Sequence, residues 1–375
     1  MGTVKVVFCM DTEGPCDDPS NDELLSSWAD VDRAMDKLFS DSFRKKHRDS
    51  AGRNFKIGWF FLTWSGFKTN PRGRDFGYHK VRDHYRERWG NLIDKFGDEE
   101  CWHYHHPPKS GIGNEWSDGW SSSKEYKNII SRQILERKWF PLCFRAGGTI
   151  MDAGLSQWVD KWFPFDYSNR APLKFNEMDW SDGVNSWRPY HPDPVNFKSI
   201  GDGRRYMTRC LDLYTGLYKV DEEDIINSFE EASKFGTSIL SVFDHDYRDI
   251  EERISLFLSK VKSVSNNFPE ITWEYSTPKN AIIDVTKIGC EESLIVESEL
   301  VGNILNIRTN SEIHQQYPWI ATKDIDGQVD QIELNIKQIS KCEWNVELNH
   351  SIRTIGVAAS SETKGAGVAI INTGI

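Results

Sequence analysis

Over the first 280 or so residues, short apolar runs alternate with longer segments whose apolar positions recur every three to four residues. The short runs are rich in Val, Ile, Phe and Trp and predict buried strands, at residues 3–10, 55–63, 100–106, 140–148, 162–168, 238–246 and 271–276. The longer segments predict helices, at residues 21–40, 78–97, 122–138, 221–236 and 249–265. Strands and helices in this alternation are typical of parallel strands joined by crossover helices, in a barrel or an open sheet.

The pattern changes after about residue 285. Short runs of alternating apolar and polar residues follow one another with turn residues between them, and no helical period is visible, in residues 293–309, 331–339, 342–349, 351–360 and 367–374. Such runs predict an all-β sandwich. We therefore predict an α/β domain over residues 1–284 and a small C-terminal β-sandwich domain over residues 285–375.

Composition narrows the classes of partner. The net charge is −11, which argues against nucleic acid or an anionic membrane as the main partner. No stretch approaches the ~20 apolar residues of a membrane span, and the N-terminus carries no export signal, so we predict a cytoplasmic protein without membrane insertion. The seven cysteines have no CxxC spacing, which favours reduced thiols, and the 15 tryptophans suit the faces of sugars as well as a core.

The first polar cluster follows the first predicted strand, in the sequence CMDTEGP. Asp11 and Glu13 are two positions apart, so on an extended chain both carboxylates point to the same side. A metal ion would relieve the repulsion between them, and one carboxylate could remain free as a base. The competing interpretation is a solvated turn, because DTEGP also has the composition of one.

Three of the ten histidines stand within four positions, in the sequence CWHYHHPPK. On a strand His103 and His105 face the same side, and His106 faces the other unless the chain turns before the prolines. Imidazole is a preferred ligand of zinc and similar divalent ions. A lone histidine is usually structural, but a cluster of three at a strand end indicates a metal site.

Two further strand ends carry charged or titratable side chains. Arg145 ends the apolar run of FRAGG, and a buried arginine requires a carboxylate, for which Asp11 is available. His245 stands between Asp244 and Asp246, and a neighbouring carboxylate can hold its tautomer, which suits a general acid. Two acids, clustered histidines, an arginine and a distal histidine together indicate a metal-assisted hydrolase.

These sequences resemble the motifs of the polysaccharide deacetylase family, which has the chitooligosaccharide deacetylase homology domain. DTEGP resembles the first motif, WHYHHP the second, FRAGG the third and FDHDYRD the last. The resemblance covers roughly residues 3–280 and implies a distorted (β/α)7 barrel, with the β-sandwich domain outside it. It also implies a metal-dependent hydrolase that removes an N-acetyl group from an amino sugar or a glycan.

The resemblance assigns a role to each catalytic candidate. The first acid of the family is the base and the second is a metal ligand, which implies Asp11 as the base and Glu13 as the ligand. The arginine of the third motif orients the base, so Arg145 takes that role, and His245 is the acid. Glu13 stands where the family usually has aspartate, so this chain would be a divergent member.

The histidines of the second motif complete the metal site. In the family they are four positions apart, but the residue four after His103 is a proline. We therefore predict His103 with His105 as the first choice and His103 with His106 as the second. The cofactor is a divalent ion, zinc first, with Co2+, Mn2+, Ni2+ and Fe2+ as alternatives.

The remaining candidates would contact the substrate. The glycines of FRAGG permit close approach of a ligand, Asp166 belongs to an aspartate-serine stretch seen in the family, and a tryptophan or tyrosine can stack on a sugar. The predicted substrate-binding residues are Gly147, Gly148, Asp166, Trp180, Tyr190 and Asp246.

The substrate implied by the resemblance is an N-acetylated saccharide or a saccharide precursor, and a homo-oligomer is left open. A second interpretation keeps the site but gives it a small amide or a cyclic ureide as substrate. A third is a pseudoenzyme, in which Glu13 and the altered histidine spacing mark a lost site and the barrel binds carbohydrate. Metal content separates the third interpretation from the other two.

Overall fold

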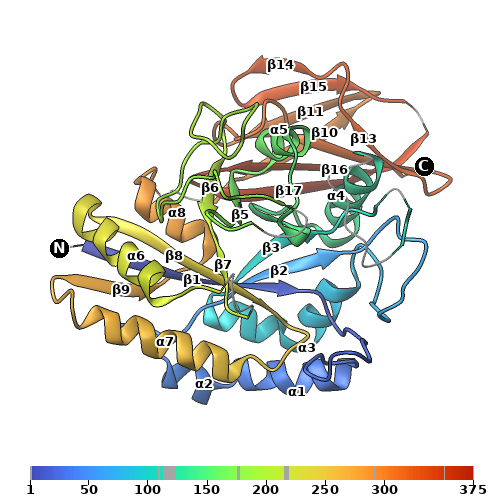
Figure 1. The fold of residues 1–375 in the computed structure, drawn as a ribbon. Coiled ribbons are helices and arrows are strands. Elements are labelled where there is room, and N and C mark those ends of the chain that lie inside the picture. The colour runs from blue at the N-terminus through green and yellow to red at the C-terminus, as the bar shows by residue number, and fades with distance from the viewer. Residues whose placement is uncertain are drawn as a thin grey trace.

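The computed structural model describes residues 2–108, 110–112, 123–174, 178–214, 219–289, 293–349 and 351–374. Its first part is a nearly closed, barrel-like parallel sheet with the strand order β6-β5-β4-β3-β2-β1-β8-β7, and β9 pairs with the start of β1 (Figure 1). The strands are β1 (Gly2–Thr12), β2 (Gly58–Thr63), β3 (Glu99–Tyr104), β4 (Cys143–Ala146), β5 (Phe165–Asn169), β6 (Tyr206–Arg209), β7 (Leu211–Asp212), β8 (Thr237–His245) and β9 (Ile271–Tyr275). The predicted fold class, an α/β barrel followed by a β domain, is confirmed.

Helices cover the outside of this sheet, except for the last one, whose apolar side chains belong to the interior core (Figure 1). They are α1 (Trp28–Leu38), α2 (Asp41–Lys46), α3 (Lys80–Phe96), α4 (Ser123–Arg137), α5 (Ala153–Trp162), α6 (Glu222–Phe235), α7 (Glu251–Ser265) and α8 (Pro278–Thr286). Apolar side chains of α1, α2, α3, α6 and α7 share one core with the outward-facing side chains of β1, such as Val6 and Phe8. Across the described ranges, no helix combines the length and apolarity that a bilayer crossing requires.

The two-residue period of the strands decides which side chains enter the barrel. On β1, Val7 and Cys9 lie in the interior core, whereas Val6, Phe8 and Met10 pack against the outer helices. The same alternation holds on the other strands that carry candidate residues. The interior core contains Cys101 of β3, Cys143 of β4 and Ile239 and Phe243 of β8. Asp11, His103, Arg145 and His245 continue these inward rows at the C-terminal ends of their strands.

The first predicted helix begins later than the sequence pattern indicates. The helix expected over residues 21–40 starts at Trp28, because the Ser27 side chain accepts a hydrogen bond from the Asp30 N–H and caps it. Leu25, expected on the apolar face, lies before the cap and donates its N–H to the Tyr247 carbonyl. The segment before the helix is thus held against the loop that follows β8.

Several short elements escape the sequence pattern. β6 and β7 are too short to show an apolar period, and Gly147–Thr149 form a 3-10 turn where the fourth strand was expected to continue. In the C-terminal part, β12 is a strand that lies outside the five runs that the pattern predicts. Its burial is continuous over Trp319–Thr322, so it lacks clear alternation.

The C-terminal part consists of two four-stranded antiparallel sheets, in the orders β10-β11-β15-β14 and β13-β12-β16-β17. Their strands are β10 (Val296–Val301), β11 (Ile304–Thr309), β12 (Trp319–Asp324), β13 (Val329–Ile332), β14 (Lys337–Ser340), β15 (Glu343–Glu347), β16 (Ile352–Ser361) and β17 (Gly365–Asn372). A core that includes Leu305, Trp344 and Ile355 lies between the sheets. The boundary predicted at 284/285 falls in the last turn of α8.

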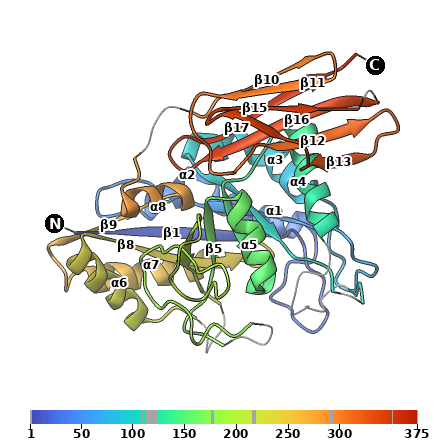
Figure 2. The same cartoon turned by 90° about the horizontal axis from the view of Figure 1, so that it is seen from above.

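The β domain packs on the barrel through α4, which contacts β12, β13 and β16 (Figure 2). Trp319 of β12 belongs to the same core as Ile134 of α4 and Trp162 of α5, and its Nε1 donates to Ser131 Oγ at 3.1 Å. Gly356 of β16 lies so close to α4 that an added Cβ would be 2.6 Å from Ile134 Cγ2. The two parts therefore share one continuous core.

Candidate metal and catalytic site

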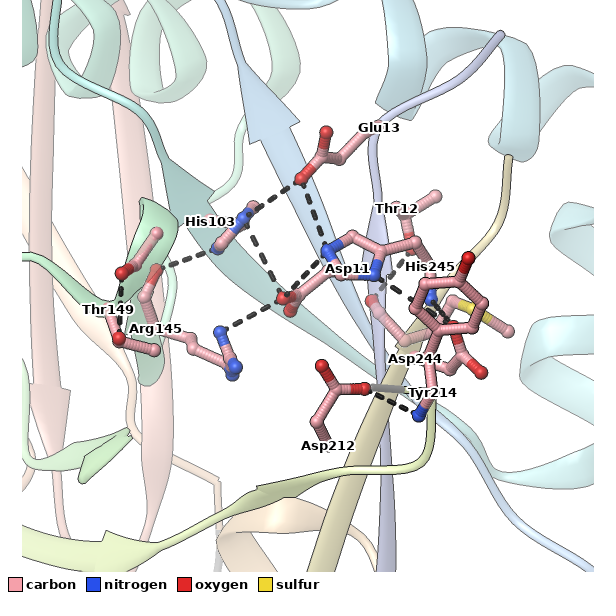
Figure 3. Close-up of polar contacts among 12 residues, drawn as sticks. Asp11, Thr12, Glu13, His103, Arg145, Thr149, Asp212, Tyr214, Asp244 and His245 are labelled. Atoms are coloured by element: carbon pink, nitrogen blue, oxygen red, sulfur yellow. Dashed lines mark hydrogen bonds and ion pairs between the residues drawn. The ribbon is translucent and has the colours of Figure 1, made fainter. Parts of the chain in front are cut away.

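The ends of β1, β3, β4 and β8 bring the main candidates together (Figure 3). Parallel pairing places Asp11 opposite His245 and His103 opposite Arg145. Because all four strands end at the same rim, these inward-facing side chains surround one space. The site is thus a direct consequence of strand register and of the odd-numbered row on each strand.

Three donor atoms form a compact triangle at this rim. His103 Nε2 and His105 Nε2 are 3.1 Å apart, and Glu13 Oε1 lies 3.4 Å from the first and 3.3 Å from the second. Ligands at about 2.0–2.2 Å from a tetrahedral zinc ion lie about 3.3–3.6 Å from one another. The buried group of Glu13, His103 and His105 could therefore hold a metal ion.

The tautomer of His103 supports the same conclusion. Its Nδ1 lies 2.9 Å from the Arg145 carbonyl oxygen, which can only accept, so Nδ1 carries the proton. In the neutral form of the ring, Nε2 then points its lone pair at the Glu13 carboxylate. Two lone pairs facing each other at 3.4 Å repel unless a cation lies between them, and fixing a ring by its second nitrogen is typical of metal-bound histidine.

The protonation states of the other two donors also suit a cation. Burial raises the pKa of Glu13, but the positive charge of Arg74 and the interactions with the His103 and His105 rings outweigh burial and hold that pKa well below its usual value. The Arg74 guanidinium lies 3.1 Å from Glu13 Oε2, which leaves Oε1 to face the imidazoles. Burial lowers the pKa of His105 to about 4, so its ring is neutral.

His106 stands apart from this group. Its side chain is buried, but it has the opposite parity to His103 and His105 on the strand and its immediate continuation. Among the described residues, the donors that lie within 4.8 Å of one another at this rim are those of Glu13, His103 and His105. The geometry thus favours the first of the two predicted histidine pairs.

Asp11 is paired with Arg145 and keeps one oxygen open. Oδ2 lies 2.9 Å from Arg145 Nη1 and 3.9 Å from His103 Nε2. The other oxygen, Oδ1, is buried and accepts no hydrogen bond from the part of the chain that the structure describes. Arg145 itself lies flat on Phe243, with the guanidinium carbon 3.7 Å from the ring centre. Asp11 is therefore a fixed carboxylate beside the triangle with a free acceptor.

His245 faces the same space from β8. Arg248 Nη1 lies 3.2 Å from its Nδ1, and because arginine can only donate, Nδ1 accepts and Nε2 carries the proton. That Nε2 lies 3.8 Å from both Asp11 Oδ2 and Glu13 Oε1. The ring stacks on Tyr247 at 4.7 Å and is more exposed than the triangle. His245 thus presents an N–H to the site.

Asp246 has a positioning role that the sequence pattern does not reveal. Its carboxylate accepts hydrogen bonds from the N–H groups of Glu13 and Gly14 and from Tyr85 Oη at 2.8 Å. Burial raises its pKa to about 6, although these three bonds favour the charged form. Asp246 therefore fixes the backbone that carries Glu13 and does not face the substrate space.

A cavity of ≈ 200 Å³ opens onto these residues. Its wall combines the site with aromatic rings and arginines, namely Asp11, Glu13, Arg72, Arg74, His105, Arg145, Gly148, Thr149, Arg170, Asp212, Tyr214, Phe243, His245, Tyr247 and Arg248. Arg74 comes from the connection after β2, in the sequence NPRGRDFG. No strand or motif marks it, so sequence reasoning passed it over.

The predicted substrate residues divide between the cavity and the core. Gly148 lines the cavity, and Gly147 lies against His105, where an added Cβ would be 2.2 Å from the ring. Asp166 is bonded to Arg205 Nε at 3.1 Å, Trp180 Nε1 to the Thr149 carbonyl at 3.3 Å, and Tyr190 Oη to the Phe197 carbonyl at 3.1 Å. Within the described ranges these three are not on the cavity wall, and their contact with a substrate stays a prediction.

Comparisons with known proteins add no family. No protein-family model matches the chain. No curated protein sequence matches it either. A solved structure of superoxide reductase (1Fe-SOR) from Giardia intestinalis is similar over 22% of this chain and 99% of its own, at 16% identity and a TM-score of 0.18. That likeness carries no argument about fold or function, so function is argued from the site alone.

Proposed function

We propose that the protein is a metal-dependent hydrolase of the polysaccharide deacetylase type, which removes an N-acetyl group from an amino sugar or a short glycan. One observation carries the proposal. A candidate metal triangle, a buried carboxylate with an oxygen that is unpaired among the described residues, and a histidine N–H lie together at one small cavity, whose wall includes Asp11, Glu13, His105 and His245. These are the parts that hydrolysis of an amide by water requires.

Glu13, His103 and His105 would hold the ion, with zinc as the first choice because of its preference for nitrogen and carboxylate ligands in a compact site. Co2+, Mn2+, Ni2+ and Fe2+ suit the same donors. Such an ion supplies Lewis acidity at the acyl oxygen and lowers the pKa of water. The protein orients the ligands of the ion. The Arg145 carbonyl fixes the His103 ring, and the Asp246 carboxylate fixes the backbone of Glu13.

The side chains around the triangle would handle the protons. Asp11 accepts a proton from the attacking water at its open Oδ1, while Arg145 holds the other oxygen in place. Water adds to the acyl carbon and the C–N bond breaks, while His245 relays the proton that Asp11 took from the water. Its Nε2 proton goes to the departing amine, and Nε2 recovers a proton from Asp11, whose Oδ2 lies 3.8 Å away. The products are acetate and a free amino sugar. Gly148 lines the same cavity, so its backbone would lie near the bound substrate.

The proposal is tested by acetate release from a panel of N-acetylated mono- and oligosaccharides, with metal content measured on the same samples. Asp11→Asn should keep the fold and the metal and lose activity by about 10²- to 10⁴-fold, because it removes the base. Asp36→Asn, an exposed carboxylate on α1, is the matched control and should retain full activity.

Two results would contradict the proposal. Full activity in Asp11→Asn would remove the base from the mechanism. Hydrolysis of small amides or ureides in the same panel, without release of acetate from any saccharide, would replace the substrate class while keeping the site.

A further inference from the structure

The cavity wall has a charge that contrasts with the rest of the molecule. The chain carries a net charge of −11, yet five arginines and three carboxylates line this cavity of ≈ 200 Å³. Two of the carboxylates, Asp11 and Glu13, already belong to the proposed catalytic and metal positions. The part of the wall left for a substrate is therefore positive, and a bound divalent ion would add to that charge.

Two of the buried guanidinium groups lie near the same aromatic ring. The guanidinium carbons of Arg145 and Arg170 lie 3.7 and 5.1 Å from the centre of the same Phe243 ring. Both side chains are almost fully buried, and Arg145 Nε and Nη2 have no hydrogen-bond partner among the described residues. Two buried like charges are costly unless anions lie close to them.

Asp212 is a carboxylate that faces Arg170 on the cavity wall. Asp212 Oδ2 is 3.7 Å from Arg170 Nη2, longer than a hydrogen bond, and Asp212 Oδ1 accepts from the Tyr214 N–H at 2.7 Å. Burial and the neighbouring charge of Arg145 lower the pKa of Arg170 despite Asp212. An anion that enters the cavity would thus meet a buried guanidinium on its wall.

Arg248 adds a second cation on another part of the wall. It lies between Tyr214 and Tyr247, at 3.9 and 4.7 Å from their ring centres, and its Nε is buried without a hydrogen-bond partner in the described ranges. Its counter-charge is Asp244, at 3.6 Å, which also pairs with Arg253 at 3.5 Å. One carboxylate thus serves two arginines, behind the cavity wall.

Arg72 stands at the more exposed part of the wall. Its side chain is 39% exposed and pairs with Asp18 at 3.0 Å. An exposed ion pair of this kind is weak and leaves the guanidinium available to a ligand. Cations therefore line the cavity both in its depth and near solvent.

We propose that the substrate carries an anionic group, a carboxylate or a phosphate, close to its acetamide, and that Arg170, Arg248 and Arg72 bind it. This inference rests on the proposed function, since it specifies the saccharide that the same cavity receives. Guanidinium groups suit both anions because their paired N–H donors match two oxygens at once. The small cavity favours a single charged sugar unit over an extended neutral chain.

Binding is measured by calorimetry on metal-free protein, so that an anion cannot bind through the ion. The probes share one sugar and differ at one carbon: N-acetylglucosamine, its 6-phosphate, and N-acetylglucosaminuronic acid. At least one anionic probe should bind about tenfold or more tightly than the neutral sugar, and the preference should fall with added salt. Preference for the phosphate or for the carboxylate identifies the source of the charge.

Arg170→Gln and Arg72→Gln should each reduce this preference, and Arg53→Gln, an exposed arginine paired with Glu274, should leave it unchanged. Arg72→Gln keeps the test valid should Arg170→Gln fail to fold. Equal affinity for all three probes, no binding of any, or a preference unchanged in both variants would overturn the inference. Anion binding without acetate release from any saccharide would remove the proposed function and leave the anion site standing. Acetate release from neutral saccharides alone would support the proposed function and overturn the anion-binding inference.

Discussion

Within the described part of the chain, the barrel interior holds two groups of residues that could ligate a metal ion, one at the mouth and one at the floor. At the mouth are Glu13, His103 and His105, and at the floor are Glu99, Cys101 and Cys143. Both groups bring three donor atoms within 4.8 Å of one another. Proximity alone therefore does not distinguish them.

The Glu99 carboxylate at the floor has hydrogen-bond partners without an ion. Glu99 accepts from the Lys279 N–H at 2.8 Å, at the start of α8, and from the Cys143 thiol at 3.2 Å. Burial raises the pKa of Cys143 to about 12, and it raises the pKa of Cys101 and of Glu99 as well. The thiols are thus protonated, and a protonated thiol is not a metal ligand.

The mouth differs in the state of its donors. The pKa of Glu13 is lowered, the ring of His105 is neutral, and the His103 lone pair faces the carboxylate. The comparison teaches that the charge state of the donors, and not short distances, separates the two groups. The predictions that follow test this difference, beginning with the largest effect.

Removal of a mouth ligand should abolish metal binding, whereas removal of a floor residue should not. His103→Ala and His105→Ala should each weaken zinc binding more than about a hundredfold, because each ligand contributes roughly 3 kcal/mol of binding. His106→Ala and Cys101→Ala are the matched controls and should each bind one equivalent of zinc. Equal metal content in all four variants, measured by elemental analysis after dialysis, would refute the distinction.

Asp246→Asn should loosen the mouth without removing a ligand. The asparagine amide has one acceptor oxygen in place of two. It therefore cannot accept all the hydrogen bonds that the carboxylate receives from the Glu13 and Gly14 N–H groups and from Tyr85. Loss of such support typically reduces metal affinity about 10- to 100-fold. Competition with a chelator measures the change, and an unchanged affinity would show that the Glu13 backbone is held by other contacts.

The floor thiols should be chemically inert in the folded protein. With a pKa of about 12 for Cys143, almost none of its thiolate forms at pH 8. Iodoacetamide should therefore modify Cys342, which is only half-buried, and leave Cys101 and Cys143 unmodified until the protein unfolds. Peptide mapping by mass spectrometry reports each site, and rapid modification of Cys143 in native protein would be inconsistent with this account.

Glu99→Gln should produce the smallest effect, and its sign depends on pH. Because the folded pKa of Glu99 is raised, the wild type loses stability as pH rises from the ordinary glutamate pKa through the folded value. The amide has no such loss, so the variant should gain stability relative to the wild type between acidic and neutral pH. Chemical denaturation at pH 4 and pH 7 measures this difference. A difference in unfolding free energy between variant and wild type that is the same at both pH values would contradict the prediction.

Much of the site follows from strand parity. Asp11, His103, Arg145 and His245 are odd-numbered residues at the ends of apolar runs, and the alternation of each run already places them inside a barrel. The same parity separates His105 from His106, although the two prolines that follow left both pairs open. Residues on predicted strands could thus be assigned from sequence because their neighbours fix their direction.

Residues on connections could not be assigned in this way. Arg74 reaches Glu13 from a long connection whose path depends on tertiary contacts, and Asp246 turns away from the cavity to bind backbone N–H groups. The early helix boundary was wrong for a similar reason, since Leu25 is held by the Tyr247 carbonyl outside the helix. In each case a distant partner decides the conformation, and no local pattern records it.

The central claim is that the barrel mouth, and not its floor, binds the ion. Anomalous diffraction from crystals grown with one equivalent of zinc tests this most directly. The account predicts one peak within about 2.0–2.3 Å of Glu13 Oε1, His103 Nε2 and His105 Nε2. A peak between Cys101 and Cys143, or none at the mouth in zinc-loaded crystals, would contradict it.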